Sequence, residues 1–103
     1  MRRQGSILVI DDEEIMREIL DTLLTREGYT VRLASSGRDG VELARSTPFD
    51  AVITDMMMPE MDGLQVLAAV RAIDDDLPVI MVTAFASMET AVSAMKKGAF
   101  DYI

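Results

Sequence analysis

The sequence contains no cysteine and no histidine among its 103 residues. It therefore offers no disulfide framework, no thiolate nucleophile, no imidazole base and no zinc site built from side-chain nitrogen or sulfur. Basic residues are also few, with 10 lysines and arginines against 18 acids and a formal net charge of -8. Contacts with nucleic-acid phosphates need clustered positive charge, so we expect no direct nucleic-acid binding by this segment. Its chemistry must use carboxylates, hydroxyls, amines and the backbone.

Long hydrophobic runs are absent as well. The apolar run at 7–10 reaches Asp11 and Asp12 too soon to be the core of a signal peptide. Nothing approaches the ~20 apolar residues that a membrane span needs. We therefore expect a cytoplasmic location without membrane contact. A chain of 103 residues, 50% of them hydrophobic, indicates one small domain without an internal boundary.

Apolar runs alternate along the chain with stretches of helical period, a pattern typical of βαβ units. The first run, at 7–10, is continuously aliphatic, as expected for a parallel strand covered on both faces, and the run at 51–54 is interpreted as a second buried strand. Strands are predicted at 7–10, 29–34, 51–54 and 79–82, with a fifth opening at 101–103, and helices at 13–27, 35–46, 64–73 and 87–98.

Acidic side chains follow two of the predicted strands. Asp11 and Asp12 end the first, Asp55 ends the third, and the hydroxyl of Thr83 follows the fourth. Ligands of an open parallel sheet bind at the carboxyl ends of its strands, so we expect these groups to lie close together. Crowded carboxylates repel one another, and Mg²⁺, which takes oxygen ligands, would relieve that repulsion.

Each of these residues also has an ordinary structural interpretation. Asp11 and Asp12 could cap a helix, and Asp55 alone could form a turn. The coincidence at neighbouring strand ends favours a site over both. For the methionines of 56–58 and for Met61 we expect packing in the core or loop, because methionine fills irregular gaps.

Four segments together resemble the receiver domain of bacterial two-component response regulators. The resemblance spans the whole chain and implies an α/β, flavodoxin-like fold. That fold is an open parallel five-stranded sheet of order 2-1-3-4-5 with helices on both faces. The segments are Ile-Leu-Val-Ile-Asp-Asp-Glu at 7–13, Thr-Asp-Met-Met-Met-Pro-Glu-Met-Asp-Gly at 54–63, Val-Thr-Ala at 82–84 and Lys-Gly-Ala-Phe-Asp-Tyr-Ile at 97–103.

The resemblance implies a phosphorylation site. Asp55 becomes the phosphoacceptor, and a Mg²⁺ or Mn²⁺ ion is bound by Asp12, Asp55 and the backbone carbonyl of Met57. Asp11 would act on the ion through a bound water. Phosphoryl transfer requires mainly positioning and charge neutralisation, which these groups can provide without any histidine or cysteine.

The resemblance also implies a switch. Thr83 would donate a hydrogen bond to the phosphoryl group, and the small Ala84 would leave room for that group to enter. The ring of Tyr102 would rotate inward into the space that Thr83 leaves. Phosphorylation would thus alter the surface around the fourth helix and the fifth strand.

Partners follow from the same resemblance. The stretches 84–87 and 97–102 are most similar to receivers of the nitrogen-regulatory type, which precede a sigma-54-activating ATPase and a DNA-binding domain. The expected partners are a sensor histidine kinase, a second copy joined through the fourth-helix and fifth-strand face, and a linked output domain. Ile15 and Met16 are candidates for kinase docking, although Met16 could equally belong to the core.

The C-terminal segment of the family is missing from residues 1–103. The family carries a lysine shortly beyond the position of Ile103, then a proline and a last helix. We therefore expect 1–103 to be a receiver domain that is incomplete at its C-terminus. Without the last helix, aliphatic side chains of the first and fifth strands would be exposed.

Three other functions remain open. An aspartyl-phosphate phosphohydrolase would need a second acid two residues after Asp55, where this chain has Met57. A flavin-binding protein of the same fold would need amide donors where the first turn is acidic. A receiver that acts as an interaction module without phosphorylation is the third, and the missing lysine is compatible with it.

Overall fold

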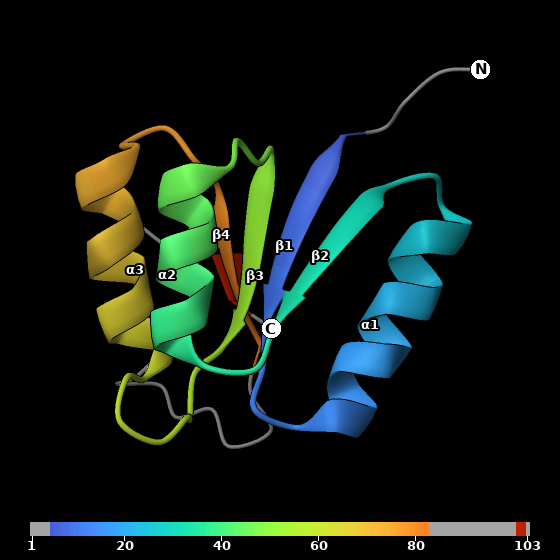
Figure 1. Ribbon diagram of the computed structural model, residues 1–103, viewed down its shortest axis with the longest axis horizontal. Coiled ribbons are helices and arrows are strands. Elements are labelled where there is room, and N and C mark those ends of the chain that lie inside the picture. Colours follow the sequence, from blue (N-terminus) through green and yellow to red (C-terminus); the bar gives the residue numbers. More distant parts are fainter. Residues whose placement is uncertain (1–4, 83–100, 103) are drawn as a thin grey trace.

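The computed structural model describes residues 5–82 and the backbone of residues 101–102. Five parallel strands form one sheet in the order β2-β1-β3-β4-β5, as the resemblance implied (Figure 1). The predicted helix at 87–98 lies outside the described residues. The elements in chain order are β1 (Ser6–Ile10), α1 (Glu14–Arg26), β2 (Thr30–Ala34), α2 (Gly37–Ser46), β3 (Ala51–Asp55), α3 (Gly63–Ile73), β4 (Val79–Val82) and β5 (Asp101–Tyr102).

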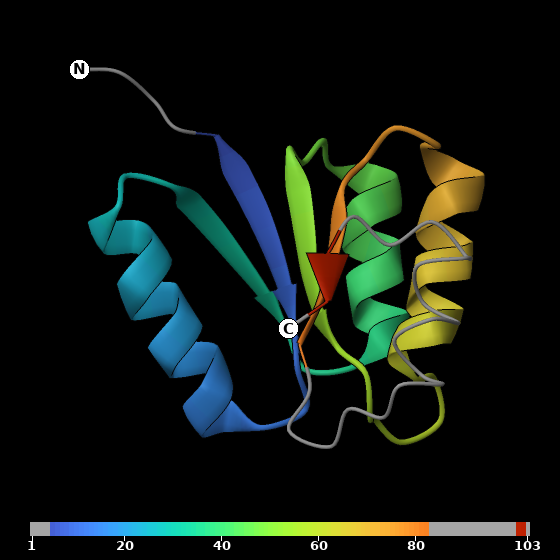
Figure 2. The ribbon, with the colours of Figure 1, turned by 180° about the vertical axis from the view of Figure 1, so that it is seen from behind.

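The described helices cover both faces of the sheet. Helices α2 and α3 lie side by side over one face, and α1 lies over the other (Figures 1 and 2). Within the described residues, no helix is both long enough and apolar enough to cross a membrane.

Strand β1 contributes side chains to the hydrophobic core on both faces of the sheet. Its side chains alternate between the faces: Leu8 and Ile10 pack in the cluster with α2 and α3, whereas Ile7 and Val9 pack on the side of α1. All four are buried. The continuous aliphatic run therefore serves both faces of a central strand, as its sequence predicted.

Local capping determines where the helices begin and end. The hydroxyl of Ser36 accepts a hydrogen bond from the backbone N–H of Asp39 at 3.1 Å, at the start of α2. Asp62 and Gln65 form a reciprocal capping box at the start of α3, so this helix begins at Gly63, one residue earlier than predicted. Gly28 follows α1 with φ of 97°, as expected of a glycine beyond a helix end.

Helix α1 contacts the sheet with only part of its apolar surface. Leu20 and Leu24 pack against Ile7, Val9 and Ile53 of the sheet. A second row remains open to solvent, with Ile15, Ile19 and Leu23 exposed by 71%, 47% and 50%.

This row corrects one expectation. We expected uncovered aliphatic side chains on the first strand, but Ile7 and Val9 are only 7% and 0% exposed. Among the described residues, most of the exposed large apolar side chains lie on α1, which itself shields β1. The side chains of β5 lie outside the description.

Candidate metal centre

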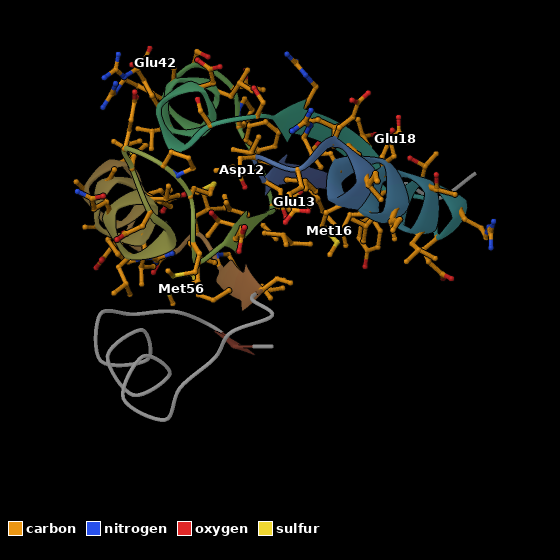
Figure 3. All side chains as sticks on the ribbon, turned by 90° about the horizontal axis from the view of Figure 1, so that it is seen from below. Asp12, Glu13, Met16, Glu18, Glu42 and Met56 are labelled. Atoms are coloured by element: carbon orange, nitrogen blue, oxygen red, sulfur yellow. The ribbon has the colours of Figure 1, made fainter. Side chains whose placement is uncertain are left out.

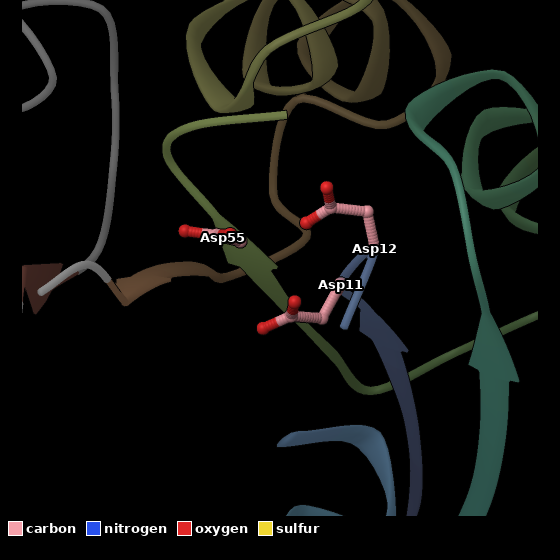
Figure 4. Close-up of side chains that lie close together, drawn as sticks. All are labelled: Asp11, Asp12 and Asp55. Carbon is pink, nitrogen blue, oxygen red and sulfur yellow. The ribbon is translucent and has the colours of Figure 1, made fainter. Parts of the chain in front are cut away.

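Two adjacent strands deliver three carboxylates to one edge of the sheet. β1 ends at Ile10 and is followed by Asp11 and Asp12, while β3 ends with Asp55. The two strands pair in parallel with Ile10 opposite Thr54, so the acids that follow meet at the same level. One carboxylate oxygen from each of Asp11, Asp12 and Asp55 lies within 4.8 Å of the other two (Figure 4). The prediction that these strand ends come together is confirmed.

Backbone amides hold two of these carboxylates. The N–H of Glu13 donates to Oδ1 of Asp11 at 2.9 Å, and the N–H of Met57 donates to Oδ1 of Asp55 at 3.3 Å. Each of the two carboxylates keeps a second oxygen for a ligand. The backbone N–H of Asp11 also donates to the carbonyl of Ala34 at 3.1 Å, which ties the loop to the end of β2.

The electrostatics of the cluster are unfavourable without a counter-charge. Burial raises the pKa of Asp11 and of Asp55, and neighbouring carboxylates raise both further. The amides of Glu13 and Met57 act in the opposite direction by stabilising the charged forms. Removal from water is therefore the main cause of the raised pKa values, and mutual repulsion adds to it.

The donor set fits a hard divalent cation. It consists of carboxylate oxygens on a partly exposed edge, with Asp11 buried, Asp55 half-buried and Asp12 exposed. Mg²⁺ typically takes one or two carboxylates and keeps waters or phosphate oxygens at its other positions. A divalent ion would also relieve the repulsion that raises the pKa values of Asp11 and Asp55.

The loop after β3 is held close to the site. The buried hydroxyl of Thr54 donates to the carbonyl of Asp55 at 3.1 Å, and the N–H of Gly63 donates to the carbonyl of Met56 at 2.9 Å. A Cβ on Gly63 would come within 2.6 Å of the Asp55 carbonyl oxygen. Only glycine lets α3 begin this near the site. The sequence pattern contained Gly63 but showed no reason for it.

The methionine run has two environments. Met56 and Met58 are buried in the core cluster and Met61 packs against it, as predicted. Met57 is 61% exposed, so the expectation of packing was wrong for this residue. It lies beside the site because its N–H bonds to Asp55. Its predicted carbonyl ligand role remains a prediction.

The other predicted residues fall in three groups. Ile15 and Met16 lie in the first turn of α1 and are 71% and 37% exposed, so they are accessible to a partner. Figure 3 looks onto this edge of the molecule, with Asp12, Glu13 and Met16 labelled. The predicted switch residue Thr83 and the predicted access residue Ala84 lie outside the described residues. Tyr102 is described only as backbone, paired with Met81.

One residue at this edge was not predicted. The guanidinium of Arg17 donates from Nη1 to the carbonyl oxygen of Asp11 at 2.8 Å. Its charge also favours the ionised form of Asp11. The residue lies on the helix while its partner lies in the loop six positions earlier, so a pattern based on strand ends does not include it.

A parallel sheet of this order with an acidic cluster at its carboxyl edge is typical of the receiver domains of signalling proteins. The chain belongs to that class: residues 7–103 match the response regulator receiver domain family. Receiver domains are signalling domains, and those of relatives are fused to output domains.

Among curated relatives, the transcriptional regulatory protein ZraR of Escherichia coli K12 is 46% identical over 97 residues. The alignment covers 94% of this chain and 22% of ZraR, so the chain spans about a fifth of that relative's length.

Solved structures agree with the fold. A response regulator of Burkholderia pseudomallei with a phosphorylated aspartic acid and a calcium ion has a TM-score of 0.90 at 33% identity, covering 96% of this chain and 58% of that one. NtrX of Brucella abortus has a TM-score of 0.89 at 32% identity, covering 96% and 23%. These similarities confirm the resemblance to receivers of the nitrogen-regulatory type.

Proposed function

We propose that Asp55 accepts a phosphoryl group from a sensor histidine kinase, and that Asp11, Asp12, Asp55 and the carbonyl of Met57 hold Mg²⁺ for this reaction. The observation that carries the proposal is the close approach of three carboxylates from β1 and β3, with one oxygen of each within 4.8 Å. Membership of the receiver family supports it. Mg²⁺, when bound, would neutralise charge on the phosphoryl oxygens during transfer.

Asp55 is suited to be the nucleophile by its position. It ends the central strand β3, and its Oδ1 is held by the amide of Met57, which leaves Oδ2 to attack. The attacking oxygen forms a bond to phosphorus while the bond from phosphorus to the donor's imidazole nitrogen breaks. The imidazole then takes up a proton, and Asp55 carries a mixed anhydride.

The neighbouring acids have a different task. Asp11 is buried, and its Oδ1 is occupied by the amide of Glu13, so it is poorly placed to reach a large donor. Asp12 is exposed beside it. Together they make the electrostatic potential at the site negative. The site therefore needs a bound cation before an anionic phosphoryl group can approach.

A switch beside β4 and β5 is part of the proposal. β4 lies between β3 and β5, and Met81 pairs with Tyr102. We propose Thr83 as the switch hydroxyl, Ala84 as the access residue and Tyr102, whose backbone lies in the edge strand β5, as the switch aromatic. Reversing a 1:99 population requires ~5.5 kcal/mol of differential binding, which a phosphoryl group with its cation can supply.

The partners of the whole protein are part of the proposal. A kinase would dock on the exposed Ile15 and Met16, close to the site. The phosphorylated surface of the fourth helix and fifth strand would pair with a second copy and regulate an output domain, as in transcription regulators. We place the protein in the cytoplasm, with no direct nucleic-acid binding by this segment and no enzymatic turnover beyond its own phosphorylation and dephosphorylation.

The extent of the domain is proposed as well. We propose that a last helix beyond residue 103 belongs to the domain, as it does in the family. The exposed side chains of Ile19 and Leu23 on α1 support this, because a small domain rarely leaves neighbouring apolar side chains uncovered.

The test is intact mass spectrometry of the full-length protein after incubation with acetyl phosphate and MgCl₂. We expect a mass increase of one phosphoryl group that disappears in Asp55→Asn and in EDTA. Asp50→Asn is the matched control, since Asp50 lies near the opposite end of β3 and bonds to the backbone of Ser6. No adduct in the parent protein would overturn the proposal in favour of an interaction module that works without phosphorylation.

A further inference from the structure

Arg17 links helix α1 to the loop that carries two of the three carboxylates. Its Nη1 donates to the carbonyl oxygen of Asp11 at 2.8 Å. That carbonyl belongs to the peptide between Asp11 and Asp12. Arg17 is half-buried one turn into the helix, and its own N–H bonds to the carbonyl of Glu13 at 3.1 Å. The side chain therefore reaches back from a fixed backbone position.

The other contacts of this loop leave Asp12 unsupported. The N–H of Asp11 is bound by Ala34, and its carboxylate by the amide of Glu13. Both interactions orient Asp11 itself. Within residues 5–82, the carboxylate of exposed Asp12 accepts no hydrogen bond, so its direction depends on the backbone before it.

We propose that Arg17 is a positioning residue that orients Asp12 toward Asp55. A peptide is planar, so a donor that holds the Asp11 carbonyl also sets the plane from which Asp12 leaves. The inference rests on the proposed function, because orientation matters when a cation must be held between these carboxylates. Partners that orient metal ligands commonly change metal affinity by about 10–100-fold when removed.

A second effect of Arg17 has the opposite sign, and this makes the inference testable. Its positive charge near the cluster repels a divalent cation. If charge were its whole contribution, a protein with a neutral residue at position 17 would bind Mg²⁺ more tightly than the parent. If Arg17 positions Asp12, the same variant protein binds Mg²⁺ more weakly than the parent, even though a repulsive charge has been removed.

The experiment is a calorimetric titration of the full-length protein with MgCl₂ alone. Asp12→Asn serves as the reference for ions bound elsewhere. We expect Arg17→Met and Arg17→Gln to weaken Mg²⁺ binding about tenfold, and Arg17→Lys, which keeps a donor within reach, to recover part of the affinity. Equal or tighter binding in both neutral variants overturns the inference.

Two controls separate positioning from loss of fold. Arg26→Met removes a charge from the exposed last turn of the same helix, far from the site, and should leave Mg²⁺ affinity within twofold of the parent. Thermal unfolding in EDTA shows that each variant is folded at the titration temperature, and Arg17→Gln provides a milder variant than Arg17→Met. Absence of Mg²⁺ binding in the parent would instead overturn the proposed function and this inference with it.

Discussion

Gly63 at the start of α3 lies directly against Asp55 at the end of β3. A Cβ at position 63 would meet the Asp55 carbonyl oxygen at 2.6 Å and the Met56 Cα at 2.8 Å. Both of these atoms are backbone, so neither can move aside at low cost. The carboxyl end of the central strand and the first turn of the helix are thus held at one fixed distance.

We therefore expect Gly63→Ala to destabilise the protein by about 1–3 kcal/mol and to weaken Mg²⁺ binding, because the loop after Asp55 must shift. Urea denaturation and an MgCl₂ titration measure the two effects. Ala68→Gly, on the exposed face of the same helix, should cost about 1 kcal/mol and leave the affinity unchanged. Equal Mg²⁺ affinity in Gly63→Ala and the parent would contradict the expectation.

The pH dependence of stability follows from Asp11 and Asp55. The folded state raises the pKa of both above the ordinary value of 3.8. It therefore binds more protons than the unfolded state, and this contribution to stability falls as pH rises from about 3.8 through the raised pKa values. In EDTA, Asp55→Asn should be more stable than the parent at pH 7, with the advantage shrinking toward pH 3.

Denaturant midpoints across this pH range, with and without MgCl₂, measure that effect. The cation should remove most of the difference at pH 7, because it replaces the missing counter-charge. The carboxylate of Asp50 accepts a hydrogen bond from the backbone N–H of Ser6. The variant Asp50→Asn should therefore show no gain in stability over the parent at pH 7. A parent protein more stable than Asp55→Asn in EDTA at pH 7 would show that burial and repulsion do not dominate.

Glu60, in the loop between Asp55 and α3, has a φ of 65°, a backbone conformation that residues other than glycine rarely adopt. Glycine accepts this region without steric cost, whereas a β-branched residue is strongly disfavoured there. We expect Glu60→Gly to be neutral or stabilising by up to about 1 kcal/mol, and Glu60→Val to be destabilising by about 1–2 kcal/mol. Thermal unfolding of the two variants measures this difference. A Glu60→Val protein more stable than Glu60→Gly would contradict the conformational argument.

Ile15 tests the kinase-docking surface. A charged residue at this 71% exposed position should slow phosphoryl transfer from the cognate kinase at least tenfold, since desolvated apolar contacts dominate binding at such a surface. Phosphorylation by acetyl phosphate should be unchanged. Thr25→Glu places the same charge on an exposed position of the same helix, further from the site, and is the control. Equal loss in both assays for Ile15→Glu would argue against docking.

The exposed row on α1 makes a prediction about length. A protein extended by about twenty residues beyond 103, enough for one more helix, should be markedly more stable than the 103-residue chain. The reason is burial of Ile19 and Leu23, which are 47% and 50% exposed in the 103-residue chain. Denaturant midpoints of the two lengths test this, and equal midpoints would contradict it. Leu23→Ser should reduce the stability of the longer protein more than that of the shorter one.

Much of the fold could be predicted because local signals agreed with one another. The aliphatic run of β1, the glycine after α1 and the Ser36 cap of α2 each reflect short-range chemistry, and their elements formed within one or two residues of prediction. The strand order came from the family resemblance. The expected exposure of β1 was wrong, because shielding of Ile7 and Val9 by α1 depends on how the helix sits over the sheet.

The sequence by itself determined which carboxylates take part in the site, because parallel strands present their carboxyl ends at one edge and Asp11, Asp12 and Asp55 follow two of them. Tertiary structure alone decided the rest. The tie from Arg17 to the Asp11 carbonyl and the approach of Gly63 to Asp55 each join residues from different elements. Neither has a periodic signature, since the distances come from helix placement on the sheet rather than from neighbouring residues.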